Sequence, residues 1–214
     1  MTKWIDITQP LTNDMAHWPG DRPFEYKVAA SKEQTGSANV GMITTSVHIG
    51  THVDSPFHFE NNGETIEKIP IDTYIGKALV IDVSEYAAIT PKVLKNFNLG
   101  GVKRLLIRTS LPNNPKFFPE VIPFLDPAIG EYLAEKGVNL LGVDMPSVDP
   151  ITSKTLDTHH ALHLNGIHIL ENIMLDNVKT GYYELIALPL KIVGSDGSPV
   201  RAVLRPLKED NQHA

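Results

Sequence analysis

The feature that most constrains the fold of this chain is the run HIGTHVDSPFH at residues 48–58. It places three histidines and one aspartate around a glycine and a proline within eleven residues. Neutral imidazole and carboxylate groups are good ligands for Zn²⁺ or Mn²⁺. The alternative is a polar turn whose histidines are held by hydrogen bonds, which a single histidine would favour. The whole constellation instead favours a metal site, a catalytic site, or both.

The run is not expected to form a helix, because Gly50, its β-branched neighbours and Pro56 all oppose one. On a strand, His48, His52 and Asp54 would share one face. A straight strand rises about 3.3 Å per residue, however, so His48 and His52 would lie roughly 13 Å apart, too far to share one ion. We therefore predict a bend at Gly50, a short extended piece through His52 and Asp54, and the end of strand pairing at Pro56.

A second histidine-rich stretch, DTHHALHLNGIHILEN, covers residues 157–172. Its first part, from about Asp157 to Leu164, is predicted to form a helix. On that helix His159 and His163 share one face, whereas His160 points about 100° away. The spacing does not choose among these three, and at least two of the four histidines in the stretch are expected on the surface.

Glu171 lies near the end of this stretch between apolar pairs, Ile169-Leu170 before it and Ile173-Met174 after it. A carboxylate in such a run is rarely buried without a partner, so a metal or another cation is expected beside it. On a strand, the odd spacing would put His168 and Glu171 on opposite faces. Asp144, at another predicted strand end, is a further carboxylate that could face a site.

The composition is that of an ordinary globular protein, with 42% hydrophobic and 21% charged residues, and one domain over residues 1–214 is the simplest expectation. The net charge of −6 and the lack of a Lys/Arg run argue against nucleic acid as a partner. We expect no membrane partner, since no apolar stretch is long enough to span a bilayer. The start lacks the apolar core of a signal peptide, so a cytoplasmic location is expected. Because there is no cysteine, any metal must be held by His, Asp, Glu, backbone or water.

Short β-rich runs dominate the chain, which predicts an α+β fold with more sheet than helix. The predicted strands are Trp4–Thr8, Phe24–Ala29, Val40–His48, Ala78–Val83, Arg104–Thr109, Asn139–Asp144, Ile167–Glu171, Tyr183–Val193 and Val200–Leu207. Two further helices are predicted, from Thr90-Pro91 to about Phe97 and from Asp126-Pro127 to a stop at Gly137. Residues 194–199 are predicted as a turn between two strands.

Several common catalytic motifs are absent. There is no H-E-x-x-H for zincin-type proteolysis and no G-x-S-x-G nucleophile elbow, and neither a Walker A motif nor a dinucleotide fingerprint occurs. The chemistry is therefore expected to centre on the two histidine-rich stretches.

The run at residues 48–58, written H-x-G-T-H-x-D-x-P-x-H, resembles the signature of the cyclase family of metal-dependent hydrolases. Further blocks follow the family in order across essentially the whole chain: HWPGD, SVDPITSKTLDTHH, HILEN, YELIALPL and GSDGSPVRAVLR. Within the family they are most similar to bacterial kynurenine formamidases (arylformamidases). The resemblance implies a single β-rich domain of swivelling β/β/α architecture, in a homodimer or larger homo-oligomer.

The resemblance also implies a site with two divalent metal ions, most simply Zn²⁺, with Mn²⁺ as the alternative. It assigns three residues of the opening run to the first ion: His48, His52 and Asp54. It makes Asp54 a bridge to the second ion, which two residues of the later stretch would complete: His159 and Glu171. His58 would stay off the metals as the general acid/base, and Trp18 would line the substrate pocket.

The reaction that the resemblance implies is hydrolysis of N-formyl-L-kynurenine, a small-molecule substrate, to L-kynurenine and formate by metal-activated water. One alternative keeps this chemistry and changes the substrate to another amide, such as the cyclic amide isatin. A second alternative is a non-catalytic module that binds metal or small molecules, in which His58 would be dispensable.

Overall fold

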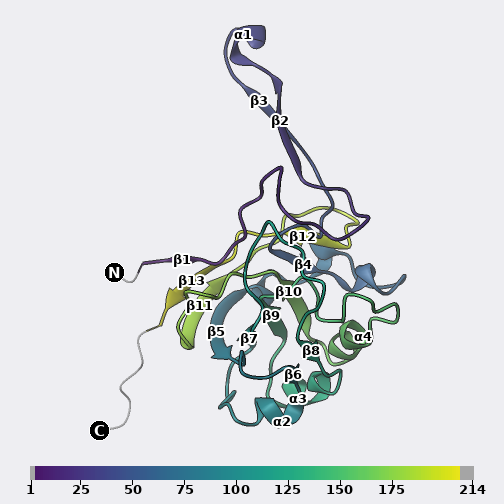
Figure 1. Cartoon of the computed structure of the whole chain (residues 1–214), viewed down its shortest axis with the longest axis vertical. Coiled ribbons are helices and arrows are strands. Elements are labelled where there is room, and N and C mark those ends of the chain that lie inside the picture. The colour runs from purple at the N-terminus through teal and green to yellow at the C-terminus, as the bar shows by residue number, and fades with distance from the viewer. Residues whose placement is uncertain (1–2, 208–214) are drawn as a thin grey trace.

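The centre of the fold is formed by four parallel strands, because their nearly unbroken apolar runs can be buried on both faces. A computed structural model describes residues 3–207 of the chain. The four strands are β5 (Ile75–Asp82), β7 (Arg104–Arg108), β9 (Leu140–Val143) and β10 (His168–Glu171). They pair in that order in the middle of a sheet that curls round itself (Figure 1).

Helices lie in the connections between these strands, as parallel pairing requires. They are α2 (Pro91–Leu94), α3 (Ile129–Glu135) and α4 (Asp157–Leu164). Their buried side chains form one hydrophobic core with the sheet face that includes Leu105 and Leu141. The opposite face, with Leu106 and Leu170, forms a second core against the remaining strands. The predicted cap at Thr90 is confirmed, since its side chain accepts a hydrogen bond from the backbone N–H of Val93.

Antiparallel strands complete both edges and give nine strands in the order β1-β13-β11-β5-β7-β9-β10-β4-β12 within the described residues. One edge carries β11 (Gly181–Ile186), β13 (Val203–Pro206) and β1 (Ile5–Asp6). The other carries β4 (His52–Asp54) and β12 (Gly197–Pro199), both antiparallel to their neighbours. The predicted short extended piece at His52 and Asp54 is β4, and it lies between strands that come much later in the chain.

Small elements surround this sheet. Three 3₁₀ helices follow β4: η1 (Pro56–His58), η2 (Ile66–Lys68) and η3 (Ile71–Thr73). A short parallel pair, β6 (Ala88–Ile89) and β8 (Phe124–Leu125), lies beside the helices. Among the described residues, no helix is long and apolar enough to cross a membrane.

Some sequence expectations need correction. Residues 194–199 are not only a turn, because Gly197–Pro199 forms the edge strand β12 by pairing with β4. The strand predicted at 183–193 ends at Ile186 in β11, and a loop follows. The error at β12 has a physical reason, since a three-residue Gly-Ser-Pro strand has none of the β-branched or aromatic residues that favour strands.

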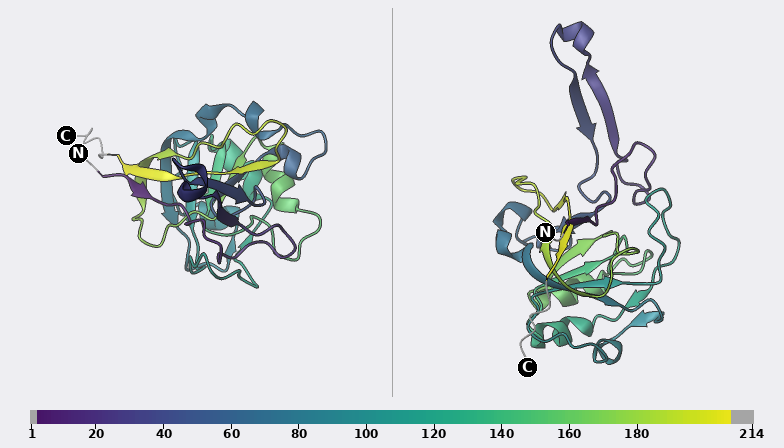
Figure 2. Two further views of the ribbon diagram at one scale, coloured as in Figure 1. Left: turned by 90° about the horizontal axis from the view of Figure 1, so that it is seen from above. Right: turned by 90° about the vertical axis from the view of Figure 1, so that its left-hand side faces the viewer.

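A β-hairpin projects far from the rest of the fold (Figures 1 and 2). It consists of β2 (Glu25–Ala30), the short helix α1 (Lys32–Thr35) and β3 (Val40–Thr44), and we call residues 25–44 the arm and the rest of the described chain the body. The strand predicted at 40–48 therefore ends at Thr44, where the arm returns to the body. The fold class is confirmed as β-rich with few helices.

Candidate active site

The run at residues 48–58 bends at Gly50, as the sequence predicts. Gly50 has a φ of 56°, in the left-handed region that favours glycine. The bend brings the ring centroids of His48 and His52 to 5.2 Å from each other. A side chain at position 50 would also meet Leu11, because an added Cβ would lie 2.9 Å from its Cδ2. The side chain of Leu11 can move aside, so it is the left-handed backbone conformation that requires glycine at this position.

The pairing of β10 with β4 places Glu171 beside these residues. Glu171 of β10 lies directly opposite His52 of β4, so the two side chains share a face of the sheet. Asp54 lies two residues along on that same face. The Nε2 atom of His52 is 3.4 Å from Asp54 Oδ1 and 3.4 Å from Glu171 Oε2. The Nδ1 atom of His52 lies 2.9 Å from the carbonyl oxygen of Gly50, a partner that turns Nε2 toward the carboxylates.

His159 reaches the same point from the first turn of α4. Its Nε2 atom lies 3.6 Å from Asp54 Oδ2 and 3.8 Å from Glu171 Oε1. Asp149 holds it there, because its carboxylate lies 2.6 Å from His159 Nδ1 and accepts the backbone N–H groups of Thr158 and His159. We call five residues the cluster: His48, His52, Asp54, His159 and Glu171.

Two other histidines of α4 lie outside the cluster. The rings of His160 and His163 pack edge-on against Phe59, with centroid distances of 5.4 and 5.6 Å. His159 is buried, whereas His160 and His163 are half-exposed. Asp144 is also elsewhere, since its carboxylate accepts hydrogen bonds from the backbone N–H and hydroxyl of Thr109.

His58, at the end of η1, covers the cluster from the solvent side. Its ring centroid lies 3.9 Å from that of His48, and 32% of its side chain is exposed. Asp196 lies next to both rings, 3.0 Å from His48 Nε2 and 3.6 Å from His58 Nδ1. Gly197 leaves space for this contact, because an added Cβ would lie 2.9 Å from Cε1 of His48.

Asp196 and Asp149 were not predicted from the sequence as site residues. Asp149-Pro150 has the composition of a turn, and Asp196 belongs to a segment predicted as a turn. Asp149 lies eight residues before the start of α4, so its contact with His159 depends on the path of the loop between them. For Asp196 no local signal exists, because its contact with His48 depends on the pairing of β12 with β4.

Burial and charge oppose each other strongly in the cluster. Burial alone would lower the pKa of His48, but Asp196 and Asp54 raise it to about 10. Burial likewise opposes protonation of His159, while Asp149 and Asp54 raise its pKa to about 10. Burial would raise the pKa of Asp54, yet the surrounding imidazoles hold it well below the usual range.

Glu171 is the exception among these groups. Burial and the nearby charge of Asp54 raise its pKa well above the usual range. Its Oε1 atom accepts one hydrogen bond, from the backbone N–H of Val148. Without a cation beside it, Glu171 is therefore held in its protonated form, and a bound cation would stabilise the ionised carboxylate.

The donors fit a metal ion. Asp54 Oδ2 is buried and has no hydrogen-bond partner, an unusual state for a carboxylate oxygen. Two sets of donor atoms each lie within 4.8 Å of one another, and Asp54 belongs to both: one with His48 and His58, the other with His52 and Glu171. Imidazole and carboxylate donors in a cysteine-free site suit Zn²⁺ or Mn²⁺.

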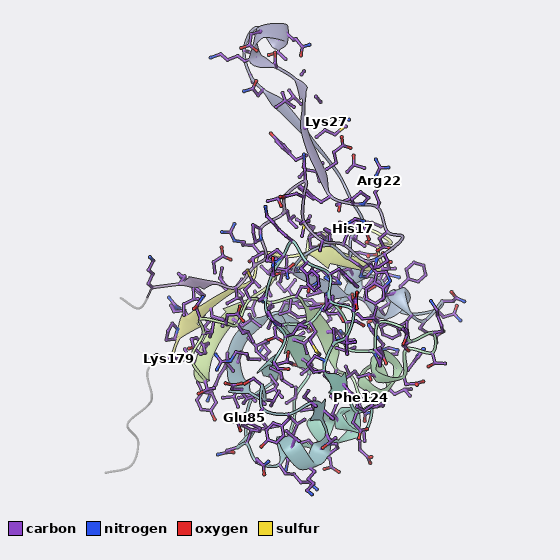
Figure 3. All side chains as sticks on the ribbon, in the orientation of Figure 1. His17, Arg22, Lys27, Glu85, Phe124 and Lys179 are labelled. Carbon is purple, nitrogen blue, oxygen red and sulfur yellow. The ribbon has the colours of Figure 1, made fainter. Side chains whose placement is uncertain are left out.

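A cavity opens beside His48. Trp18, predicted to line a substrate pocket, forms part of its wall, and its ring packs edge-to-face on Phe118 at 5.4 Å. A backbone hydrogen bond from Ala16 to Pro115 joins the two loops that carry these rings. His17, also in the wall, is labelled in Figure 3 near the base of the arm. The cavity presents aromatic side chains next to the cluster.

Comparison with known proteins gives a consistent family. A family model described as "Putative cyclase" matches residues 5–150. Kynurenine formamidases of Bacillus cytotoxicus and Bacillus mycoides are 55% and 56% identical over 206 residues, which is 96% of this chain and 99% of each relative. A solved structure of a potential metal-dependent hydrolase with cyclase activity matches 97% of this chain and 100% of its own, with a TM-score of 0.83 and 27% identity. Isatin hydrolase A from Labrenzia aggregata shares the fold, with a TM-score of 0.79 and 22% identity over 97% of this chain and 94% of its own.

Proposed function

The chain belongs to the cyclase family and is a hydrolase, and we propose that it converts N-formyl-L-kynurenine and water to L-kynurenine and formate. The observation that carries the proposal is the buried cluster of imidazoles and carboxylates that opens beside an aromatic cavity. Likeness to kynurenine formamidases along almost the whole chain supports the choice of substrate.

We propose that the cluster holds two divalent ions, with zinc the simplest choice and manganese the alternative. His48, His52 and Asp54 would hold the first, and Asp54 would share the second with His159 and Glu171. When bound, such an ion makes a coordinated water acidic near neutral pH and offsets negative charge on a carbonyl oxygen. Asp149 would position His159, because its carboxylate holds the Nδ1 atom of the ring. The Nε2 atom then stays free to bind a metal ion.

In this reaction the hydroxyl of water adds to the formyl carbon, the carbon–nitrogen bond breaks, and the aniline nitrogen gains a proton. We assign delivery of that proton to His58. Its ring lies beside the cluster yet remains accessible to solvent, so it can exchange protons between turnovers. Asp196 would orient the ring through its contact with Nδ1, leaving Nε2 for the nitrogen of the substrate.

The aryl ring of the substrate would occupy the cavity beside His48. Trp18 and Phe118 offer two aromatic surfaces at right angles, which suits one stacked and one edge-on contact with a flat ring. The half-buried His17 and the exposed Asn114 supply polar groups at the wall for the remainder of the substrate.

We further propose that one domain carries this activity and that the chain acts as a homodimer or larger homo-oligomer. The cytoplasmic location expected from the sequence stays a prediction.

The decisive experiment is an assay of N-formylkynurenine hydrolysis before and after chelation, with metal counted per chain. We expect about two metals, loss of activity on chelation, and recovery when zinc or manganese is restored. Activity that survives complete metal removal would contradict the mechanism. Isatin, tested in parallel, separates the substrates: equal or faster isatin turnover would contradict the formamidase assignment. Tight binding of N-formylkynurenine without turnover in metal-replete protein would instead support a binding module.

A further inference from the structure

Asn172, which directly follows Glu171, has a backbone conformation that favours glycine. Its φ is 56°, and Leu156 is the only other non-glycine residue with a positive φ in the part of the chain that the structure describes. A Cβ crowds the backbone in this region, so glycine adopts it most easily and asparagine is one of the few other residues that visit it. Glycine would serve the backbone equally well, so the side chain at position 172 needs another reason.

The left-handed residue also changes which way the chain faces at the end of β10. On a continuous strand, Asn172 would lie on the same face as Leu170, inside the second core. Instead, Leu170 and Ile173, three residues apart, both pack in that core, and Asn172 forms part of the wall of the cavity beside His48. The turn at Asn172 therefore moves a polar residue out of an apolar core and into the cavity in which we place the substrate.

The backbone of Asn172 is held from both sides. Its N–H donates to the carbonyl oxygen of Met145 at 2.9 Å, and its carbonyl oxygen accepts the hydroxyl of Thr51 at 2.6 Å. Within the described residues these are its hydrogen bonds, so the carboxamide of this half-buried residue is left free. A fixed backbone and a short side chain give the carboxamide a defined position before any substrate arrives.

Two other polar residues of the cavity wall are already engaged. Gln9 donates from Nε2 to the side-chain oxygen of Asn113 at 3.3 Å. The two ring nitrogens of His48 lie 2.9 and 3.0 Å from carboxylate oxygens. Asn172 thus offers a free carboxamide in the wall, one residue along the chain from Glu171 of the cluster.

We propose that the carboxamide of Asn172 is a catalytic donor: its Nδ2 donates a hydrogen bond to the oxygen of the attacked carbonyl, which is the formyl oxygen in N-formylkynurenine. This inference rests on the proposed function, since it adds a residue to the same reaction. The formyl group must lie where the cavity meets the cluster, because the aryl ring occupies the cavity and the reaction takes place at the cluster. Asn172 lies at that boundary, since it lines the cavity and directly follows Glu171.

The hydrogen bond would matter most during the reaction itself. The oxygen of water bonds to the formyl carbon, and one electron pair of the C=O bond moves onto the formyl oxygen. The pair returns when the C–N bond breaks, and the proton that water loses ends on the aniline nitrogen through His58. A donor aimed at the formyl oxygen binds it more strongly as negative charge develops there, so it lowers the barrier more than it tightens substrate binding.

Two variants separate the side chain from the backbone conformation. Asn172→Gly removes the carboxamide and keeps the left-handed φ without strain, whereas Asn172→Ala removes the carboxamide and adds strain. If the carboxamide is the donor, both variants should lose about 10²–10³-fold in kcat with little change in KM. If Asn172 serves only the backbone, Asn172→Gly should keep the kcat of the wild type and Asn172→Ala alone should lose it. That second pattern overturns the proposal.

Metal content and urea unfolding are measured on the same metal-loaded samples. Asn172→Gly should keep the metal content of the wild type and unfold near the same urea concentration. Asn177→Gly is the matched control, because it makes the same replacement at an exposed position outside the cavity wall, and it should keep both kcat and KM. Loss of metal together with kcat in Asn172→Gly would mean that Asn172 acts by holding Glu171 in place, which overturns its role as a donor.

A second substrate separates this proposal from the proposed function. Each variant is assayed with N-formylkynurenine and with isatin, since hydrolysis of either places negative charge on a carbonyl oxygen. If the wild type acts on isatin alone, the formamidase assignment is wrong, and the effect of Asn172→Gly on isatin turnover then decides the role of Asn172. If the wild type and Asn172→Gly hydrolyse N-formylkynurenine equally fast, the substrate assignment stands and the role of Asn172 is wrong. A wild type that hydrolyses neither substrate overturns both.

Discussion

In the cluster, charged side chains are buried, whereas in the arm large apolar side chains are exposed. Each region reverses the distribution that water normally imposes on a folded chain. In the cluster, Asp54 and Glu171 are almost fully buried; in the arm, Tyr26 and Ile43 are about half exposed or more. The difference teaches that the two regions have different unmet requirements: the cluster offers buried donors that suit cations, and the arm offers apolar side chains that suit an apolar surface. Changes to the two regions should therefore affect different measurements.

The largest effect should come from Asp54→Ala, which removes the carboxylate common to both donor sets. We expect loss of most bound metal and of measurable hydrolysis, because both ions lose a ligand. Metal content by elemental analysis and turnover of N-formylkynurenine check this. Asp82→Ala is the control, since it removes a carboxylate paired with Arg108, which lies outside the cluster. Retained metal in Asp54→Ala would show that the bridge is wrongly assigned.

His58→Ala should have the next largest effect and separates proton transfer from metal binding. We expect turnover to fall by roughly 10²–10⁴-fold, the usual range for a lost acid/base group, with metal content nearly unchanged. Metal content by elemental analysis and turnover of N-formylkynurenine again check this. If the variant loses its metal, His58 is a ligand, as its place in the donor set with His48 and Asp54 would permit.

Asp149→Asn tests whether metal affinity depends on Asp149, which holds the proposed ligand His159 in place. The amide cannot accept on both sides, so His159 loses its fixed orientation, and metal affinity should fall about 10–100-fold. Competition with a chelator of known affinity measures this. Thr90→Ala is the control, because it removes a helix cap from α2, outside the cluster. An equal loss of affinity in both variants would indicate general destabilisation rather than positioning.

The smallest effect concerns Asp144, a buried carboxylate that accepts its hydrogen bonds from Thr109 alone and has no imidazole partner. Burial raises its pKa to about 7. Between about pH 4 and 7 the folded chain keeps a proton that the unfolded chain has released, so this carboxyl group should make stability fall as pH rises through that window. Asp144→Asn keeps two hydrogen bonds to Thr109 and removes the proton. The stability difference between wild type and variant, from urea unfolding, should therefore change by at most about 1.4 kcal/mol per pH unit and level off above pH 7. A stability difference that does not change with pH would contradict the raised pKa of Asp144.

Much of the cluster was predictable because its chemistry is local. The bend at Gly50 follows from the reach of two imidazoles along a strand, and the structure confirms it. Glu171 was singled out by its apolar neighbours, and it is buried. Spacing alone did not predict which histidine of α4 lies next to Glu171. The packing of Phe59 against His160 and His163 keeps those two outside the cluster, and it depends on tertiary structure.

What escaped prediction depends on distant pairing. Asp196 meets His48 because β12, an edge strand of only three residues, pairs with β4. In the arm, by contrast, the two strands were predicted from local sequence, but the exposure of their apolar side chains was not. Alternating apolar residues indicate that one face of a strand is buried, but they do not indicate whether the same chain or another one covers that face.

The position of β4 between β10 and β12 has a consequence for biosynthesis. A ribosome delivers the histidine-rich run early, but the strands that pair with it, ending at Glu171 and Pro199, emerge more than a hundred residues later. At about 5–20 residues per second, the run spends several seconds outside the ribosome before its partners exist. The cluster is therefore a late product of translation, and loading of the proposed metal ions would follow the synthesis of nearly the entire polypeptide.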